Sequence, residues 1–160
     1  MKIVAVFLCF TLMLVTIGCS KSDESADLTF QLNETEQKAY DSLKQQLDDN
    51  ALQNLDPMSV AKLYVTARYE AEHDIAYFLY TQREDHVAWT KTEDQQIPEK
   101  DRGTKEDIAA KFNHIENGHF VETSNYQGHI EYDAEPGETS GFQMIKDESG
   151  IWKVSFMPLQ

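Results

Sequence analysis

The sequence predicts an α+β domain, with N-terminal helices packed on a curved antiparallel sheet, after a cleaved signal peptide. Apolar residues recur at helical spacing up to about residue 117, and then at the alternating spacing of strands. Pro136-Gly137 and residues 147–150 divide the alternating stretches as tight turns do, which indicates an antiparallel meander. A charge-free apolar run ends just before Cys19 near the N terminus.

The N-terminal apolar run is typical of an export signal. Lys2 supplies the positive start, and residues 3–17 carry no charge. As a helix, this run would extend roughly 22 Å, which is short against a hydrocarbon core about 30 Å thick. We therefore expect cleavage after Gly18, with an uncleaved membrane helix as the alternative. Cys9 is interpreted as an apolar residue of the signal.

Residues 16–19, Thr-Ile-Gly-Cys, resemble a lipobox, the processing site of bacterial lipoprotein precursors. The resemblance implies that the thiol of Cys19 receives a diacylglyceryl group and that Cys19 becomes the first residue. Two acyl chains anchor a protein stably, whereas a single chain binds only marginally. The expected organisation is a signal peptide at 1–18, a lipidated tether at 19–32 and one domain at 33–160. The expected location is the extracytoplasmic face of the cell membrane.

Strong acidity limits the partners of the domain. The chain has 28 acidic and 14 basic residues, for a net charge of −14. This balance argues against nucleic acid, whose binding needs lysine and arginine on the phosphates, and against close contact with anionic lipid head groups. Residues 20–32 are mostly polar and predict a flexible tether that spans about 20 Å. No cysteine follows Cys19, so we expect neither an internal disulfide nor a thiolate metal site.

The first helix is predicted to begin at Asn33 or Thr35, either of which can cap it. Asn33-Glu34-Thr35 also fits a glycosylation acceptor, but the bacterial signal favours the cap. Asp48 and Asp49, in Asp48-Asp49-Asn50, lie where the helix dipole disfavours acidic residues, which predicts a frayed end. One apolar stripe is expected on this helix: Tyr40, Leu43 and Leu47.

The next helices follow from caps and apolar spacing. Asp56 and Pro57 predict the start of a strong helix, which ends at His73-Asp74 and is followed by a short buried helix at 75–80. Residues 82–103 are polar, with only 86–89 apolar enough to dock. Thr104 and Asp107 predict the capped start of a last helix that ends by Gly118. The expected inward residues are Val60, Leu63, Tyr64, Ala67 and Ala71, then Ile108, Ala109, Phe112 and Ile115.

Four strands are predicted after Gly118, at residues 119–123, 128–133, 141–146 and 151–156. In the last strand, alternation places Trp152, Val154 and Phe156 on one face, and Lys153 with Ser155 on the other.

This order of elements resembles the nuclear transport factor 2-like fold, a cone of helices wrapped by a curved sheet. The residues that carry the resemblance are 59–64 (Ser-Val-Ala-Lys-Leu-Tyr), the break at 72–74, the aromatic segment 77–80 and the closing hairpin 141–154. The resemblance covers roughly residues 56–157 and implies an internal cavity. The fold serves enzymes, ligand binders and interaction modules, so it does not decide function. Five aromatic residues are candidates for the cavity lining: Tyr64, Tyr77, Phe112, Tyr132 and Trp152.

Two groups of polar residues are candidates for metal sites. Glu70, Glu72, His73 and Asp74 could hold a divalent cation, but the alternative is a solvated helix end. His114, Glu116 and His119 have histidines five positions apart, which suits the C-terminal end of a helix better than zinc. We expect neither a metal nor another cofactor.

The sequence favours a membrane-anchored interaction or ligand-binding module over an enzyme. Its expected partner is an envelope protein or a small ligand, reached from an anchor on Cys19. The alternative is a small envelope enzyme with an acid-base site in the cone cavity. A third possibility is capture of cations by the acidic surface.

Overall fold

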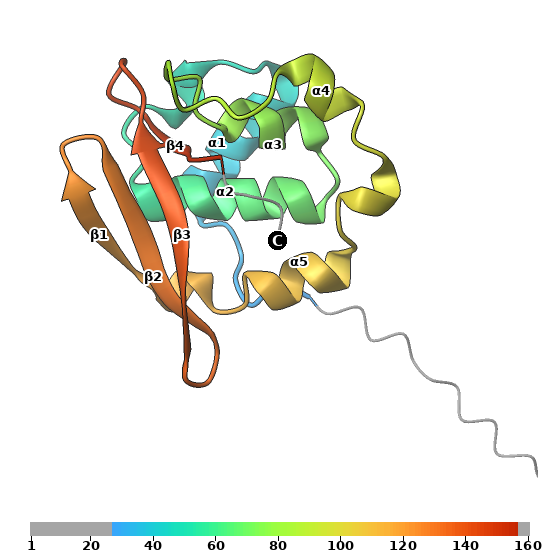
Figure 1. The fold of residues 1–160 in the computed structure, drawn as a ribbon, viewed down its shortest axis with the longest axis vertical. Helices are drawn as coiled ribbons and strands as arrows, with labels where there is room; N and C mark the ends of the chain where they lie inside the picture. The colour runs from blue at the N-terminus through green and yellow to red at the C-terminus, as the bar shows by residue number, and fades with distance from the viewer. Residues whose placement is uncertain (1–26, 157–160) are drawn as a thin grey trace, which may run out of the picture.

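Helices occupy one side of the molecule and an antiparallel sheet the other (Figure 1). The structure is a computed structural model and describes residues 27–156. The predicted signal peptide at 1–18 and the lipidation site Cys19 lie outside the described residues. The sheet is open, with four antiparallel strands in the order β1-β2-β3-β4. The predicted α+β class is therefore confirmed.

Helix α1 (Glu34–Gln45) begins at the predicted cap. The Oδ1 atom of Asn33 accepts hydrogen bonds from the backbone nitrogens of Thr35 and Glu36, at 2.9 and 3.0 Å. The side chain of Glu36 accepts in return from the backbone nitrogen of Asn33, at 2.8 Å. These reciprocal bonds form a capping box, which satisfies amide groups that have no partner inside the helix.

The end of α1 differs from the prediction. The helix stops at Gln45, so Leu47 lies outside the predicted stripe and its exposed fraction is 39%. The acidic residues that follow do not fray. Instead, Asp48 caps a 3₁₀ turn at Asp49–Leu52 by accepting from the backbone nitrogen of Asn50, at 2.9 Å.

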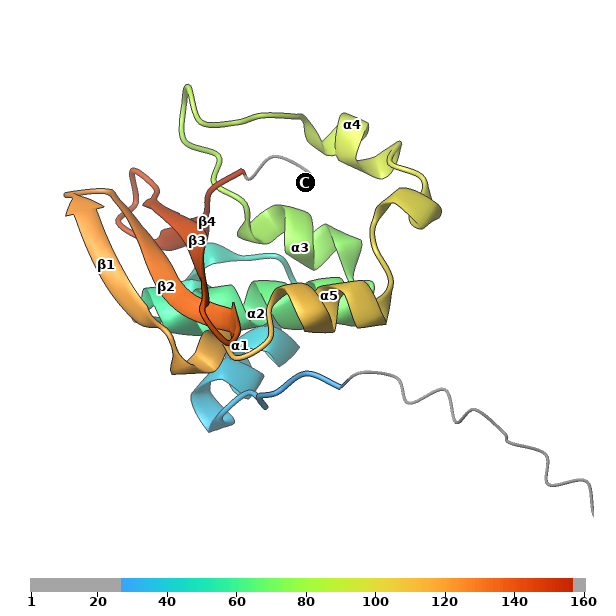
Figure 2. The same cartoon turned by 60° about the horizontal axis from the view of Figure 1, so that its bottom comes forward.

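Helix α2 (Pro57–Tyr69) is the centre of the domain. The carboxylate of Asp56 accepts from the backbone nitrogen of Ser59 at 2.8 Å, which confirms the predicted cap. Figure 2 shows α2 between α1 on one side and α3 on the other. Every residue from Ser59 to Ala67 is buried, because the sheet, α3 and α5 also contact this helix. The prediction that this helix buries one broad apolar face is therefore incomplete, because residues all around the helix are buried. Ala71, which was predicted to face inward from this helix, lies beyond its end.

Helix α3 (His73–Leu79) starts earlier than predicted. The chain breaks at residues 70–72, where Ala71 adopts a left-handed conformation with φ of 59°. His73 and Asp74 are the first residues of α3 rather than the break itself. The predicted buried segment is otherwise confirmed, with Ile75, Ala76, Tyr77 and Leu79 buried.

Residues 82–103, which were predicted as a polar connection, contain helix α4 (Lys91–Gln95) and a 3₁₀ turn (Glu99–Asp101). Of the predicted docking residues, Trp89 packs against the core, whereas Val87 is exposed. The ring of Trp89 lies edge-on to those of Tyr80 and Phe156, with centroids 5.4 and 4.5 Å apart. We call residues 82–103 the covering segment, because they lie over α3 and these rings.

Helix α5 (Lys105–Lys111) begins at the predicted capping box of Thr104 and Asp107. It ends at Lys111, before a 3₁₀ turn at Ile115–Asn117. Gly118 is the C-cap of this 3₁₀ turn rather than the end of α5, and it lies against the sheet. A Cβ atom at this position would lie 2.7 Å from the carbonyl oxygen of Glu131, so only glycine fits this approach.

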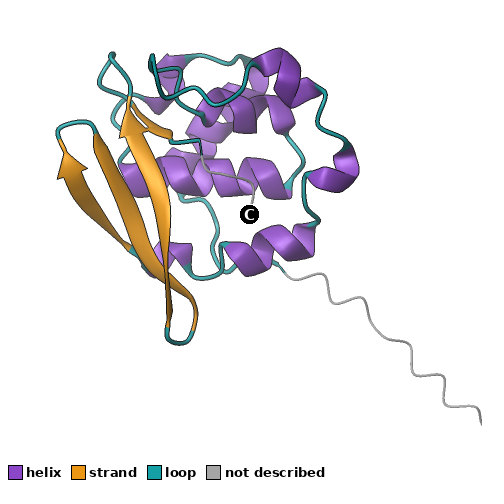
Figure 3. Ribbon diagram, in the orientation of Figure 1, coloured by secondary structure: helices purple, strands orange, loops and turns teal. Residues whose placement is uncertain are grey.

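The four strands lie at the predicted places (Figure 3), but the last one ends at Val154 rather than at residue 156. They are β1 (His119–Ser124), β2 (Gln127–Glu135), β3 (Glu138–Lys146) and β4 (Trp152–Val154). Phe142 and Met144 of β3 face α2 with Ile130 of β2 and Val154 of β4, and all four are fully buried. Lys153 of β4 is also buried, because its Nζ atom donates to Asp49 at 2.7 Å and to the carbonyl oxygen of Phe78 at 3.1 Å.

Residues 27–32, predicted as part of the tether, pack on the domain. Leu28, Phe30 and Leu32 contact the hydrophobic core. The hydroxyl of Thr29 donates to the carboxylate of Glu116 at 3.0 Å and accepts from the backbone nitrogen of His114 at 3.0 Å. Residues 27–32 therefore belong to the packed domain and not to the predicted tether at 19–32.

Candidate functional site

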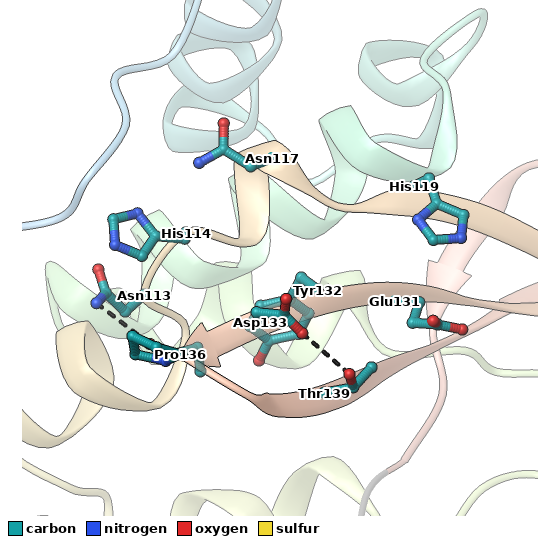
Figure 4. Close-up of a pocket in the computed structure, with 10 residues that line it drawn as sticks. Asn113, His114, Asn117, His119, Glu131, Tyr132, Asp133, Pro136 and Thr139 are labelled. Carbon is teal, nitrogen blue, oxygen red and sulfur yellow. Dashed lines mark hydrogen bonds between the residues drawn. The ribbon is translucent and has the colours of Figure 1, made fainter.

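A groove of about 570 Å³ lies between the α5–β1 connection and the adjoining ends of β2 and β3 (Figure 4). This volume lies within the range of ordinary ligand sites. One wall comes from residues 113–119, and the other comes from the sheet. The lining residues are Asn113, His114, Asn117, His119, Glu131, Tyr132, Asp133, Ala134, Pro136 and Thr139.

Unequal strand lengths create this groove. Strand β1 pairs with β2 only as far as His119, which lies opposite Glu131. Strand β2 continues to Glu135 and pairs with β3 along that whole length. Residues 132–135 therefore have a strand neighbour on one side only, and the groove runs along their other side.

The irregular end of β2 adds a backbone acceptor to the groove wall. The register between β2 and β3 shifts between Asp133 and Glu135. The carbonyl oxygen of Ala134 accepts a hydrogen bond from the side-chain nitrogen of Asn113, at 3.3 Å. A side chain of the α5–β1 connection thus bonds to the strand backbone where a neighbouring strand is missing.

Two carboxylates give the groove its charge. Glu131 is half-buried and its Oε2 atom lies 3.8 Å from Nε2 of His129. Asp133 is exposed and accepts from the hydroxyl of Thr139 at 3.0 Å. Within residues 27–156, neither carboxylate lies within 4 Å of a lysine or arginine nitrogen. Both carboxylates therefore remain able to accept from a bound molecule.

Tyr132 is a wall residue of the groove rather than a proton acceptor. Its side chain is buried, and its hydroxyl donates to the carbonyl oxygen of Lys111 at 3.0 Å. Burial raises the pKa of Tyr132 to about 12. The phenol consequently stays protonated near neutral pH and holds β2 against the end of α5.

The structure separates most of the five aromatic residues predicted to line a cavity. Tyr64 and Phe112 meet in the core, with ring centroids 6.4 Å apart, and each contacts Phe142 edge-on. Tyr77 lies under the covering segment, where its hydroxyl donates to the carbonyl oxygen of Trp89 at 3.2 Å. The other two lie elsewhere: Tyr132 at the groove, and Trp152 against Phe120, with centroids 4.9 Å apart.

A second cavity of about 30 Å³ lies between α2, α3 and the covering segment. Arg68 donates from its guanidinium to the hydroxyl of Tyr64 at 2.9 Å and to the carbonyl oxygen of Arg102 at 2.6 Å. The hydroxyls of Tyr64 and Tyr80 are 2.5 Å apart, and burial raises the pKa of Tyr80 well above its usual range. This space suits about one or two water molecules and is too small for an organic ligand.

The two polar groups weighed as metal sites bind other side chains. Glu70 pairs with Lys44 at 2.8 Å, and Asp74 pairs with Lys91 at 2.7 Å, which lowers the pKa of Asp74. His73 lies 3.1 Å from Glu99. In the other group, His114 and His119 form walls of the groove. Across the described residues, no three His, Cys, Asp or Glu side chains are placed to hold a metal ion.

Comparison of the chain with protein-family models, curated proteins and solved structures found no match. The helices between residues 27 and 156 are all too short or too polar to cross a bilayer. The assignment of function therefore depends on the sequence and on the geometry of the groove.

Proposed function

We propose that the chain is a bacterial lipoprotein that binds a partner at the extracytoplasmic face of the cell membrane. Cys19 carries the diacylglyceryl anchor, and the acidic domain is the binding module. Residues 16–19, with their resemblance to a lipobox, support the anchor. The net charge of −14 supports a domain that stands away from anionic head groups.

The groove along the half-paired end of β2 is the observation that carries the binding role. Its polar lining is open to solvent, whereas Tyr64, Phe112 and Phe142 fill the space between α2 and the sheet. Acid-base catalysis is supported less well, because the hydroxyl of Tyr132 already donates to the backbone carbonyl oxygen of Lys111. Turnover of a small substrate by the purified protein would contradict the binding role.

We also propose that the fold is a reduced form of the nuclear transport factor 2-like cone. Helix α2 lies across the inner face of the sheet and contacts β1, β3 and β4. Helix α3 and the covering segment lie on the far side of α2 from α1 (Figure 2). This arrangement supports a cone whose interior is filled by aromatic rings.

Replacing Cys19 with serine is expected to move the protein from the membrane fraction to the soluble fraction. A serine hydroxyl does not take the place of the thiol that receives the diacylglyceryl group, and the acidic domain has little affinity for lipid on its own. The measurement is the share of protein that stays with bacterial membranes after a high-salt wash, which removes proteins held by charge.

Cys9→Ser is the matched control for this experiment. It makes the same chemical change ten residues earlier, inside the apolar run, and is expected to leave the protein with the membranes. The proposed anchor is wrong if the Cys19→Ser protein stays in the washed membranes to the same extent as the natural chain even though its mass shows that residues 1–18 have been removed.

A further inference from the structure

We propose that the groove binds an extended peptide segment with basic side chains, which adds as a short strand to the free side of β2. This inference rests on the proposed binding role and names the class of its partner. Three features of the described residues carry it: the half-paired strand, the direction of its backbone groups and the position of two carboxylates.

The backbone of β2 presents hydrogen-bonding groups to the groove. The carbonyl oxygen of Glu131 points to the β1 side, because it lies 2.7 Å from the position of a Cβ atom at Gly118. Backbone groups of alternate residues in a strand point to the same side. The amide and carbonyl of Asp133 therefore also face the β1 side, past the point where β1 pairing ends.

An extended segment can use these groups by strand addition, in which main-chain hydrogen bonds give affinity and alternate side chains give specificity. The stretch of β2 beyond the β1 pairing, residues 132–135, is about 13 Å long, and within it Asp133 offers both its amide and its carbonyl to the residue opposite it. The bond from Asn113 to the carbonyl oxygen of Ala134 marks the far end of this stretch.

The charge of the groove selects basic side chains. Glu131 and Asp133 are two positions apart in β2, so their side chains lie on the same face of the sheet. A peptide strand beside β2 places every second side chain on that same face. Lysine or arginine opposite Asp133 would thus meet that carboxylate and lie diagonally across from Glu131, whose direct neighbour is His119. Neither carboxylate pairs with a lysine or arginine within residues 27–156.

The test measures binding of a blocked peptide, acetyl-Ala-Lys-Ala-Lys-Ala-amide, to the full chain in detergent by isothermal titration calorimetry. We expect saturable binding at least tenfold tighter than that of the same peptide with glutamine for lysine. The double variant Glu131→Gln, Asp133→Asn keeps the acceptor for Thr139. It should weaken binding of the lysine peptide about tenfold, because it removes the solvent-exposed ion pairs with the two carboxylates.

The matched control is the double variant Glu122→Gln, Glu148→Gln, which removes two exposed acidic charges outside the groove lining. It should bind the lysine peptide like the natural chain. Equal affinities for the lysine and glutamine peptides, or equal losses in the two double variants, would overturn the proposal. These results do not depend on where the protein lies in the cell, so they are separable from a failure of the membrane anchor.

Methylated peptides test the strand addition itself. One peptide carries N-methyl groups on the two lysine amides, and another carries them on the first and last alanine amides. Amides on one side of an added strand bond to β2, so only one of the two peptides should lose binding. If both bind like the parent peptide, charge attraction alone holds the peptide and the strand addition is wrong.

Discussion

Replacing Lys62 with methionine is expected to lower the free energy of unfolding by about 3–5 kcal/mol, because it leaves a buried carboxylate without its cation. The side chain of Lys62 is 11% exposed and that of its partner Glu36 only 4%, with 2.5 Å between Nζ and Oε2. The other oxygen of Glu36 accepts from the hydroxyl of Ser59 at 3.0 Å. Guanidinium unfolding followed by tryptophan fluorescence measures the change.

The control is an exposed pair on α1, the helix that carries Glu36: Lys38 and Glu34 are 2.7 Å apart, with side chains 75% and 85% exposed. Lys38→Met should change stability by less than about 0.5 kcal/mol. Adding Glu36→Gln to Lys62→Met should recover a large part of the loss, because it removes the buried charge. The amide oxygen can accept from the backbone nitrogen of Asn33 in place of Oε2, while the amide nitrogen donates to the hydroxyl of Ser59. Equal effects of Lys38→Met and Lys62→Met would contradict this explanation.

Replacing Trp89 with alanine is expected to cost about 3 kcal/mol and to release the covering segment. The indole ring is the main apolar contact of this segment, against Tyr80 and Phe156. Its Nε1 atom also donates to the buried carboxylate of Asp94, at 3.3 Å. Faster cleavage between residues 82 and 103 by a dilute protease, under native conditions, would report the release.

Val87→Ala provides the control within the same segment. Val87 is 41% exposed, so its truncation should change neither the stability nor the cleavage pattern measurably. If Trp89→Ala lowers stability without faster cleavage in this segment, the indole supports the core but does not hold the covering segment.

Helix starts with a side-chain cap could be predicted from the sequence, because a cap depends on residues within one turn, whereas α3, which has no such cap, starts earlier than predicted. Asn33, Asp56 and Thr104 each accept the backbone hydrogen bonds expected of them. Strand positions could also be predicted, since alternation and turn residues are local signals. Helix ends were less predictable: α1 and α5 both stop earlier than their apolar spacing indicates.

Contacts between distant residues explain what the sequence did not reveal. The face of α2 that carries Lys62 is buried because Glu36, 26 residues away, neutralises the ammonium. The covering segment is polar, yet it packs because Trp89 reaches Tyr80 and because Arg102 pairs with the buried Asp94 at 3.4 Å. Neither pairing leaves a periodic signal in the sequence.

Only a few residues of the candidate site could be predicted from the sequence. Tyr132 alone of the five expected cavity residues lines the groove, and His114 and His119 line it without a metal-binding arrangement in the described residues. Asn113, Asp133 and Thr139 carried no motif. The groove exists because β1 stops pairing while β2 continues, a difference between two strands that no local motif marks.

The mass of the N-terminal tryptic peptide from the membrane-bound protein tests the proposed anchor most directly. Cleavage after Lys21 should give a peptide of residues 19–21 that begins at Cys19 and is heavier than the bare peptide by a diacylglyceryl group. An unmodified Cys19, or a chain that still begins at Met1, would contradict the account.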